Sequence, residues 1–180
     1  MADPETQWSW VGGVTKGSTE RRGLCICCSY PGTEFALPGT PPDQAALQKV
    51  LIDNGYAVTL LTDADSSKIQ PTKDNIVRYM ADLCAWLDAA PGRQGFISYS
   101  GHGTQQVDTS GDEIDGKDEA MVPTNFMTDG LLTDDELRKT IVFGKGSALM
   151  VFMDCCHSGA AAAEDALPER KPSKPSARPT

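Results

Sequence analysis

Two apolar runs in the sequence end on side chains that can do catalytic chemistry. Residues 95–100 lead into His102, and residues 148–153 lead into Cys156. An imidazole can take the proton of a thiol near neutral pH, and the resulting thiolate is a strong nucleophile. If the two runs are neighbouring parallel strands, both side chains emerge at the same edge of one sheet. The pair therefore predicts a cysteine nucleophile assisted by a histidine base, which is the chemistry of a cysteine peptidase.

The turns that carry these side chains favour the same chemistry. Gly103 lets the backbone approach a substrate closely, and its amide, together with that of Cys156, can stabilise an oxyanion. Strand alternation places Cys155 on the side opposite Cys156, so we expect Cys155 to be a packing residue. His157 is a poorer base than His102, because a neighbouring imidazole on the same turn points poorly at Cys156.

The surrounding sequence predicts the elements that must hold these turns. Apolar runs predict strands, and helical spacing with capping signals predicts the helices between them. The expected strands are 24–30, 56–61, 96–100 and 149–153, and the expected helices begin at Asp43, Thr72 and Thr133. This order predicts a three-layer α/β/α sandwich with a mostly parallel central sheet. Sites in such sheets lie at the carboxyl ends of the strands.

Composition bounds the domain organisation and the partners. The 180 residues suit one domain over 23–167, with a flexible arm over 1–22 and a disordered, proline-rich and basic tail over 168–180. A formal net charge of −9 disfavours nucleic acid and anionic membranes and suits cationic ligands. No apolar run reaches the roughly 20 residues of a membrane span. Without a signal peptide, the six cysteines indicate a reducing compartment, the cytoplasm or the nucleus.

The remaining thiols have a simpler interpretation as small apolar core residues. This set comprises Cys25, Cys27, Cys28 and Cys84. An alternative hypothesis is a metal or redox site built from Cys25, Cys28 and Cys155, because the first two have the spacing of a metal-binding pair.

Three segments together resemble the metacaspases, a family of caspase-like peptidases. Residues 99–103 (Tyr-Ser-Gly-His-Gly) and 154–159 (Asp-Cys-Cys-His-Ser-Gly) resemble its two active-site signatures, and 112–119 resembles its acidic loop. The similarity covers 23–167, the large (p20-like) catalytic part. The resemblance implies the caspase–haemoglobinase fold, with His102 as the base and Cys156 as the nucleophile of a cysteine endopeptidase.

The resemblance also implies the substrate. Metacaspases cleave protein and peptide substrates after Arg or Lys, and the residues of their primary specificity (S1) pocket correspond here to Asp43, Ser100 and Asp154. A guanidinium group pairs well with converging carboxylates, which agrees with this assignment. Asp43 alone has a second interpretation as the N-cap of a helix.

Many metacaspases require calcium, and the resemblance places such a site on four carboxylates. These are Asp118, Asp134, Asp135 and Asp165. Carboxylate oxygens suit Ca²⁺, although Asp134 and Asp135 also fit the role of acidic residues at a helix N-terminus. No organic cofactor is expected.

The family's small (p10-like) part has no counterpart in this sequence after about residue 168. Three interpretations follow: a fragment, a processed large subunit, or a stand-alone p20 protein with a separate p10-like subunit as its partner. Without a p10-like part, we expect the strand 149–153 to be an exposed sheet edge. The alternative function is a non-catalytic or partner-dependent p20-like module that binds or regulates a complete peptidase. If the chain processes itself, the candidate cleavage sites are Arg170, Lys171, Lys174 and Arg178.

Overall fold

The computed structural model of the chain describes residues 20–66, 68–107 and 117–155. Within them, four parallel strands form the central sheet in the order β2-β1-β3-β7. Their bounds are Ala57–Thr62 (β2), Arg21–Cys27 (β1), Gln94–Ser100 (β3) and Ala148–Asp154 (β7). The predicted three-layer architecture with a mostly parallel sheet is confirmed.

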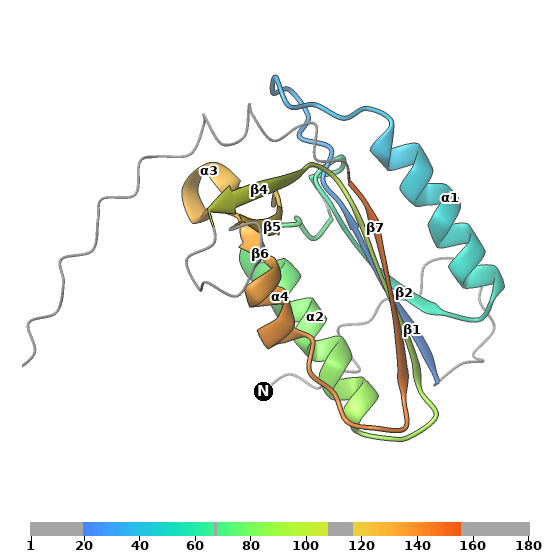
Figure 1. Cartoon of the computed structure of the whole chain (residues 1–180). Coiled ribbons are helices and arrows are strands. Elements are labelled where there is room, and N and C mark those ends of the chain that lie inside the picture. Colours follow the sequence, from blue (N-terminus) through green and yellow to red (C-terminus); the bar gives the residue numbers. More distant parts are fainter. Residues whose placement is uncertain (1–19, 67, 108–116, 156–180) are drawn as a thin grey trace, which may run out of the picture.

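Helices cover both faces of this sheet (Figure 1). Helix α1 (Thr40–Asp53) packs against β1 and β2 on one face, and α2 (Lys73–Asp88) packs against β1 and β3 on the other. Helix α4 (Asp134–Thr140) lies beside α2. Most of the largest side chains that are fully buried come from the two inner strands and from α2, among them Leu24, Ile26, Ile97, Tyr99, Met80 and Leu83.

A smaller antiparallel sheet follows β3, in a region that the sequence predicted only as acidic loop with short strands. Its order is β4-β5-β6, with bounds Gly103–Val107 (β4), Lys117–Met121 (β5) and Leu132–Thr133 (β6). The short helix α3 (Phe126–Asp129) connects β5 to β6. The inner end of this sheet is apolar and buried at Ala120, Met121 and Leu132, which joins it to the main core.

Local signals predicted two of the helix starts correctly. Thr72 caps α2 by accepting a hydrogen bond from the Asn75 amide, and Thr133 forms a capping box with Glu136 at α4. Helix α1 begins at Thr40 rather than at Asp43, because prolines are tolerated in a first helical turn and two of them follow Thr40. Asp43 is therefore in the first turn of α1 and is not its N-cap.

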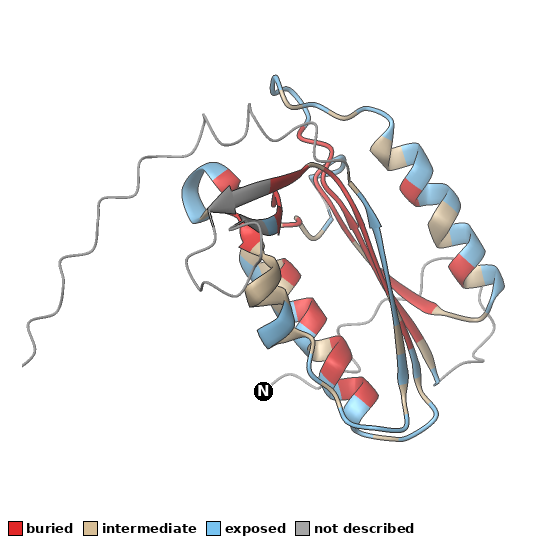
Figure 2. Ribbon diagram, viewed as in Figure 1, coloured by how far each residue is buried: buried red, intermediate tan, exposed pale blue. Residues whose placement is uncertain are grey.

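The apolar run of β7 is by itself typical of a buried strand, but the strand lies at the exposed sheet edge that we also expected. It lies at the edge of the sheet, where among the described residues it pairs only with β3. Its side chains are apolar but exposed, with 63% of Met150, 50% of Phe152 and 41% of Met153 accessible to solvent (Figure 2). The strand is apolar without being covered by any element in the described part of the chain.

The first strand begins inside the segment that was predicted to be a flexible arm. Strand β1 starts at Arg21, three residues earlier than the apolar pattern indicated. Arg22 is buried, and its guanidinium lies 4.6 Å from the centre of the Trp86 ring. The rest of the predicted arm and the whole predicted tail lie outside the described residues. In the part of the chain that is described, no helix has the length and apolarity to cross a membrane.

Candidate active site

The base and the predicted nucleophile follow two strands that are direct neighbours. Strands β3 and β7 pair in parallel with Ser100 opposite Asp154, and the Gly101 amide donates a hydrogen bond to the Asp154 carbonyl at 3.4 Å. His102 comes two residues after Ser100, and Cys155 directly follows Asp154. Cys156, the predicted nucleophile, lies outside the described residues. The expected arrangement of neighbouring parallel strands is confirmed as far as Cys155.

The imidazole of His102 is held in one tautomer by a backbone carbonyl. Its Nε2 atom lies 2.9 Å from the carbonyl oxygen of Phe35. Because a carbonyl oxygen only accepts hydrogen bonds, Nε2 carries the proton and Nδ1 is left as the basic nitrogen. The ring also stacks against Tyr30, with 5.1 Å between the ring centres.

Two buried tyrosines hold the backbone of His102 from both sides. Its amide donates to the Tyr30 hydroxyl at 3.1 Å, and its carbonyl accepts from the Tyr99 hydroxyl at 2.7 Å. The Tyr30 hydroxyl in turn donates to the Val122 carbonyl at 2.6 Å. Burial raises the pKa of both phenols, so the two hydroxyls stay neutral and serve as hydrogen-bonding groups. Gly101 leaves room for this network, because a Cβ atom there would lie 2.7 Å from the Tyr99 hydroxyl.

Asp63 anchors the loop that carries Tyr30 and Phe35. One of its carboxyl oxygens accepts from the Ser29 amide and hydroxyl at 2.7 and 2.6 Å, and the other accepts from the Tyr30 amide and the Thr124 hydroxyl, both at 2.9 Å. Sequence reasoning missed Asp63, Tyr30 and Phe35. The available signal was a lone carboxylate at the carboxyl end of β2, level with the two catalytic turns.

The predicted oxyanion donor Gly103 is buried and begins β4, directly after His102. It lies opposite Met121 of β5 in the antiparallel ladder. The second predicted donor, the amide of Cys156, lies outside the described residues.

The three predicted specificity residues lie at the same end of the sheet but differ in exposure. Asp154 is exposed at the end of β7, next to Ser100, whose hydroxyl is buried and donates to Gln44 Oε1 at 3.0 Å. The Gln44 amide nitrogen also donates to the Ser98 hydroxyl at 2.7 Å. This contact ties the first turns of α1 to β3 and brings the exposed Asp43 to this edge. Sequence reasoning missed Gln44, which looks like an ordinary polar helix residue.

The predicted calcium ligands are described only in part. Asp134 and Asp135 lie at the start of α4 and form ion pairs with Arg138, at 2.5 and 3.3 Å. The backbone of Asp118 lies in β5, while its side chain and all of Asp165 lie outside what is described. In the described segments, no group of three or more His, Cys, Asp or Glu side chains is placed to hold a metal ion. As described, Asp134 and Asp135 fit the helix-terminus role.

The other thiols are packing residues, as the sequence predicted. Cys25, Cys27, Cys28 and Cys84 are buried and free, and Cys155 is half-buried against the core. Burial raises the pKa of the Cys25 thiol to about 11, so it is neutral and unreactive at physiological pH. Since no metal cluster forms among the described residues, the structure contradicts the alternative of a metal site built on Cys25, Cys28 and Cys155.

Comparisons with known proteins agree on the family. Residues 21–164 match the family model of the metacaspase, peptidase C14 domain. Metacaspase-1A of Neurospora crassa is 40% identical over 149 residues, which cover 79% of this chain and 32% of that protein. Metacaspase-3 of Trypanosoma brucei brucei is 36% identical over 167 residues, which cover 87% of this chain and 45% of that protein. The chain thus spans between a third and a half of the length of these relatives.

A solved structure supports the same fold. The crystal structure of protein GSU0716 from Geobacter sulfurreducens superposes with a TM-score of 0.58 at 30% sequence identity. The match covers 78% of this chain and 53% of that one.

Proposed function

Because this chain belongs to the metacaspase family of C14 peptidases, we propose that it is the catalytic part of a cysteine endopeptidase that cleaves after Arg or Lys. Cys156 is the nucleophile and His102 the base. The observation that carries this proposal is the hydrogen bond from His102 Nε2 to the Phe35 carbonyl. With Nε2 donating to this carbonyl, Nδ1 is the nitrogen that carries the lone pair in the neutral ring, on a residue that follows the strand next to β7.

The proposed reaction has two steps. Nδ1 of His102 takes the thiol proton, and the Cys156 sulfur attacks the scissile carbonyl, whose oxygen becomes negative beside the amides of Gly103 and Cys156. The imidazolium then gives its proton to the leaving amine, which breaks the C–N bond and leaves a thioester. Water hydrolyses this acyl-enzyme with His102 again acting as the base.

Arg or Lys specificity is proposed from Asp154, Asp43 and Ser100. Asp154 lies beside Ser100 at the end of the nucleophile strand, and Gln44 brings the first turn of α1 to the same edge. Two carboxylates at one edge suit a cationic side chain, and Arg can bind them in a bidentate manner.

The test is hydrolysis of fluorogenic peptides that end in Arg, Lys or Asp. We expect turnover of the Arg and Lys peptides, and no turnover by Cys156→Ala or His102→Ala. Activity that persists in Cys156→Ala, or a preference for the Asp peptide, would refute the assignment.

We further propose that calcium stimulates the activity by binding Asp118, Asp134, Asp135 and Asp165. The support is the position of Asp134 and Asp135, which begin the helix that packs against β5, the strand containing Asp118. Calcium would have to compete with Arg138 for both carboxylates. Calorimetric titration with Ca²⁺ tests this: Arg138→Met should bind more tightly than the wild type, and Asp134→Asn more weakly. Equal binding by all three would contradict it.

The second candidate function is a p20-like module that needs a p10-like partner. The exposed apolar edge β7 favours it, since such edges pair with further strands. Labelling of Cys156 by an Arg chloromethyl ketone separates the candidates. Labelling of the chain alone supports an autonomous enzyme, whereas labelling only after a p10-like fragment is added supports the partner-dependent module.

A further inference from the structure

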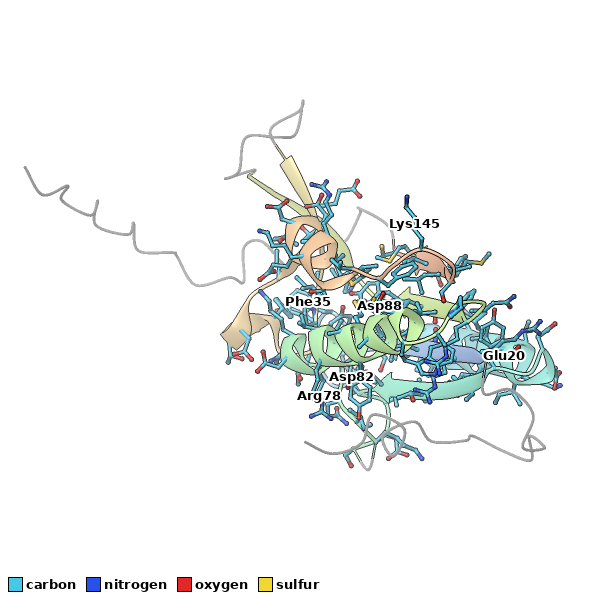
Figure 3. The ribbon with its side chains drawn as sticks, turned by 90° about the horizontal axis from the view of Figure 1, so that it is seen from below. Glu20, Phe35, Arg78, Asp82, Asp88 and Lys145 are labelled. Atoms are coloured by element: carbon cyan, nitrogen blue, oxygen red, sulfur yellow. The ribbon has the colours of Figure 1, made fainter. Side chains whose placement is uncertain are left out.

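A cavity of about 480 Å³ lies on the other side of the loop that holds His102. Its walls include Tyr30 and Phe35, the same two residues that contact the His102 imidazole. Phe126 of α3 also lines the cavity, and Figure 3 shows the labelled Phe35 at the end of the molecule where α2 begins. His102 itself does not line the cavity, so Tyr30 and Phe35 connect the cavity to the base. Sequence reasoning did not predict this cavity.

The charge of the cavity is negative. Two carboxylates line it, Glu34 and Asp63, and no Lys, Arg or His is among its lining residues. Asp63 is nearly buried and fixed by four hydrogen bonds from Ser29, Tyr30 and Thr124. Glu34 is exposed, and no residue in the described part of the chain forms an ion pair with it. A cation entering the cavity would therefore meet one fixed carboxylate and one available carboxylate.

The remaining walls are apolar and aromatic. Phe35 and Phe126 meet edge to face with 5.5 Å between ring centres, and Tyr30 meets Phe126 in the same way at 6.5 Å. Met127 lines the cavity with 51% of its surface exposed. Aromatic faces attract cations, and apolar walls pack against the methylene groups of long basic side chains. The combination fits a Lys or Arg side chain better than a carboxylate or a small apolar group.

We propose that this cavity is a second substrate subsite, which binds a Lys or Arg side chain within the first two residues after the scissile bond. The base must reach the leaving amine to protonate it, so the segment that begins at that amine passes His102 and the adjoining cavity. This inference rests on the proposed peptidase function. It adds a specificity that the S1 residues Asp43, Ser100 and Asp154 do not supply.

Internally quenched peptides test the proposal, because they keep the residues after the scissile bond. A series with Arg before the bond would carry Lys, Arg, norleucine or Glu at the first or second position after it. For the full chain we expect kcat/KM to be about fivefold higher with Lys than with norleucine. This ratio corresponds to the binding free energy of one partly exposed charge pair. Glu34→Gln should lose this preference, and Asp53→Asn, an exposed carboxylate at the far end of α1, should keep it.

A binding measurement keeps the test independent of turnover. The probes are Lys-Gly-Gly-amide and norleucine-Gly-Gly-amide, which mimic the amine-side product. Their binding is monitored by the NMR chemical shifts of the backbone amides of the full chain. We expect shifts at Glu34 and Phe126 with the Lys peptide only. Equal shifts with both peptides, no shifts, or a Lys preference that survives in Glu34→Gln would overturn the subsite. Failure to cleave any Arg peptide would instead count against the peptidase proposal and would leave this binding result to decide the subsite.

Discussion

Replacing Tyr30 by phenylalanine removes one hydroxyl group from beside His102 and keeps the ring that stacks on the imidazole. The hydroxyl accepts from the His102 amide at 3.1 Å and donates to the Val122 carbonyl at 2.6 Å. The Val122 carbonyl also lies 3.1 Å from the Tyr99 hydroxyl, but that hydroxyl has a single proton and donates it to the His102 carbonyl at 2.7 Å. The substitution therefore leaves the partly buried His102 amide without its acceptor, and it also takes the donor at 2.6 Å away from the Val122 carbonyl.

The structure sets the size of the expected effects. One orphaned backbone donor should lower the free energy of unfolding by about 1–3 kcal/mol. The turn at His102 would also lose one of the two hydroxyls that fix its backbone, so Nδ1 would be less well aimed at the thiol. We expect kcat to fall by about ten- to a hundredfold with little change in KM, because the substrate contacts are untouched.

The assays are urea denaturation and hydrolysis of an Arg peptide, performed where each variant is fully folded. Tyr79→Phe is the matched control, since it removes the hydroxyl of another buried tyrosine, in α2 and outside this network. Its kcat should equal that of the wild type. If Tyr30→Phe loses stability but keeps the wild-type kcat, Tyr30 is only a core residue and the positioning argument is wrong.

Three further predictions concern other parts of the structure. Gly101→Ala should destabilise the fold by about 1–3 kcal/mol in urea denaturation, since its Cβ would lie 2.7 Å from the Tyr99 hydroxyl; unchanged stability would contradict the close contact. Desolvation raises the pKa of Glu136, but contacts with Lys73 outweigh it and lower the pKa below its ordinary 4.5. The free energy of unfolding of the wild type should therefore fall as pH falls through that pKa. In the same acid titration, the free energy of unfolding of Glu136→Gln should fall by less. In native protein at neutral pH, iodoacetamide should leave Cys25 unmodified by mass spectrometry, because desolvation raises its pKa to about 11; modification there would refute the packing role.

The sequence predicted the elements whose signals are local. Thr72 and the capping box at Thr133 are short-range patterns, and both helices begin where those patterns indicate. The apolar runs before His102 and Cys156 predicted β3 and β7 as neighbouring parallel strands, and their register confirms it. Patterns within a few residues were sufficient in these cases.

What the sequence did not predict depends on contacts between distant segments. Asp63 is 33 residues from Tyr30, and Gln44 is 54 residues from Ser98. A buried carboxylate or amide has the same letter in the sequence as an exposed one, and only the folded chain shows which donors surround it. The exposed edge at β7 was expected only from the resemblance to a family with a further part, because an apolar strand at an uncovered sheet edge has the same composition as a buried one.

The exposed edge strand has a consequence for how activity could be controlled. Local opening of a sheet begins where the fewest side chains are buried, and here that is β7, the strand that leads to the proposed nucleophile. Amide hydrogen exchange should therefore be faster in β7 than in β1, although both belong to one sheet. A molecule that binds the closed form of β7 would raise the catalytically competent population by mass action, without touching the substrate or the base.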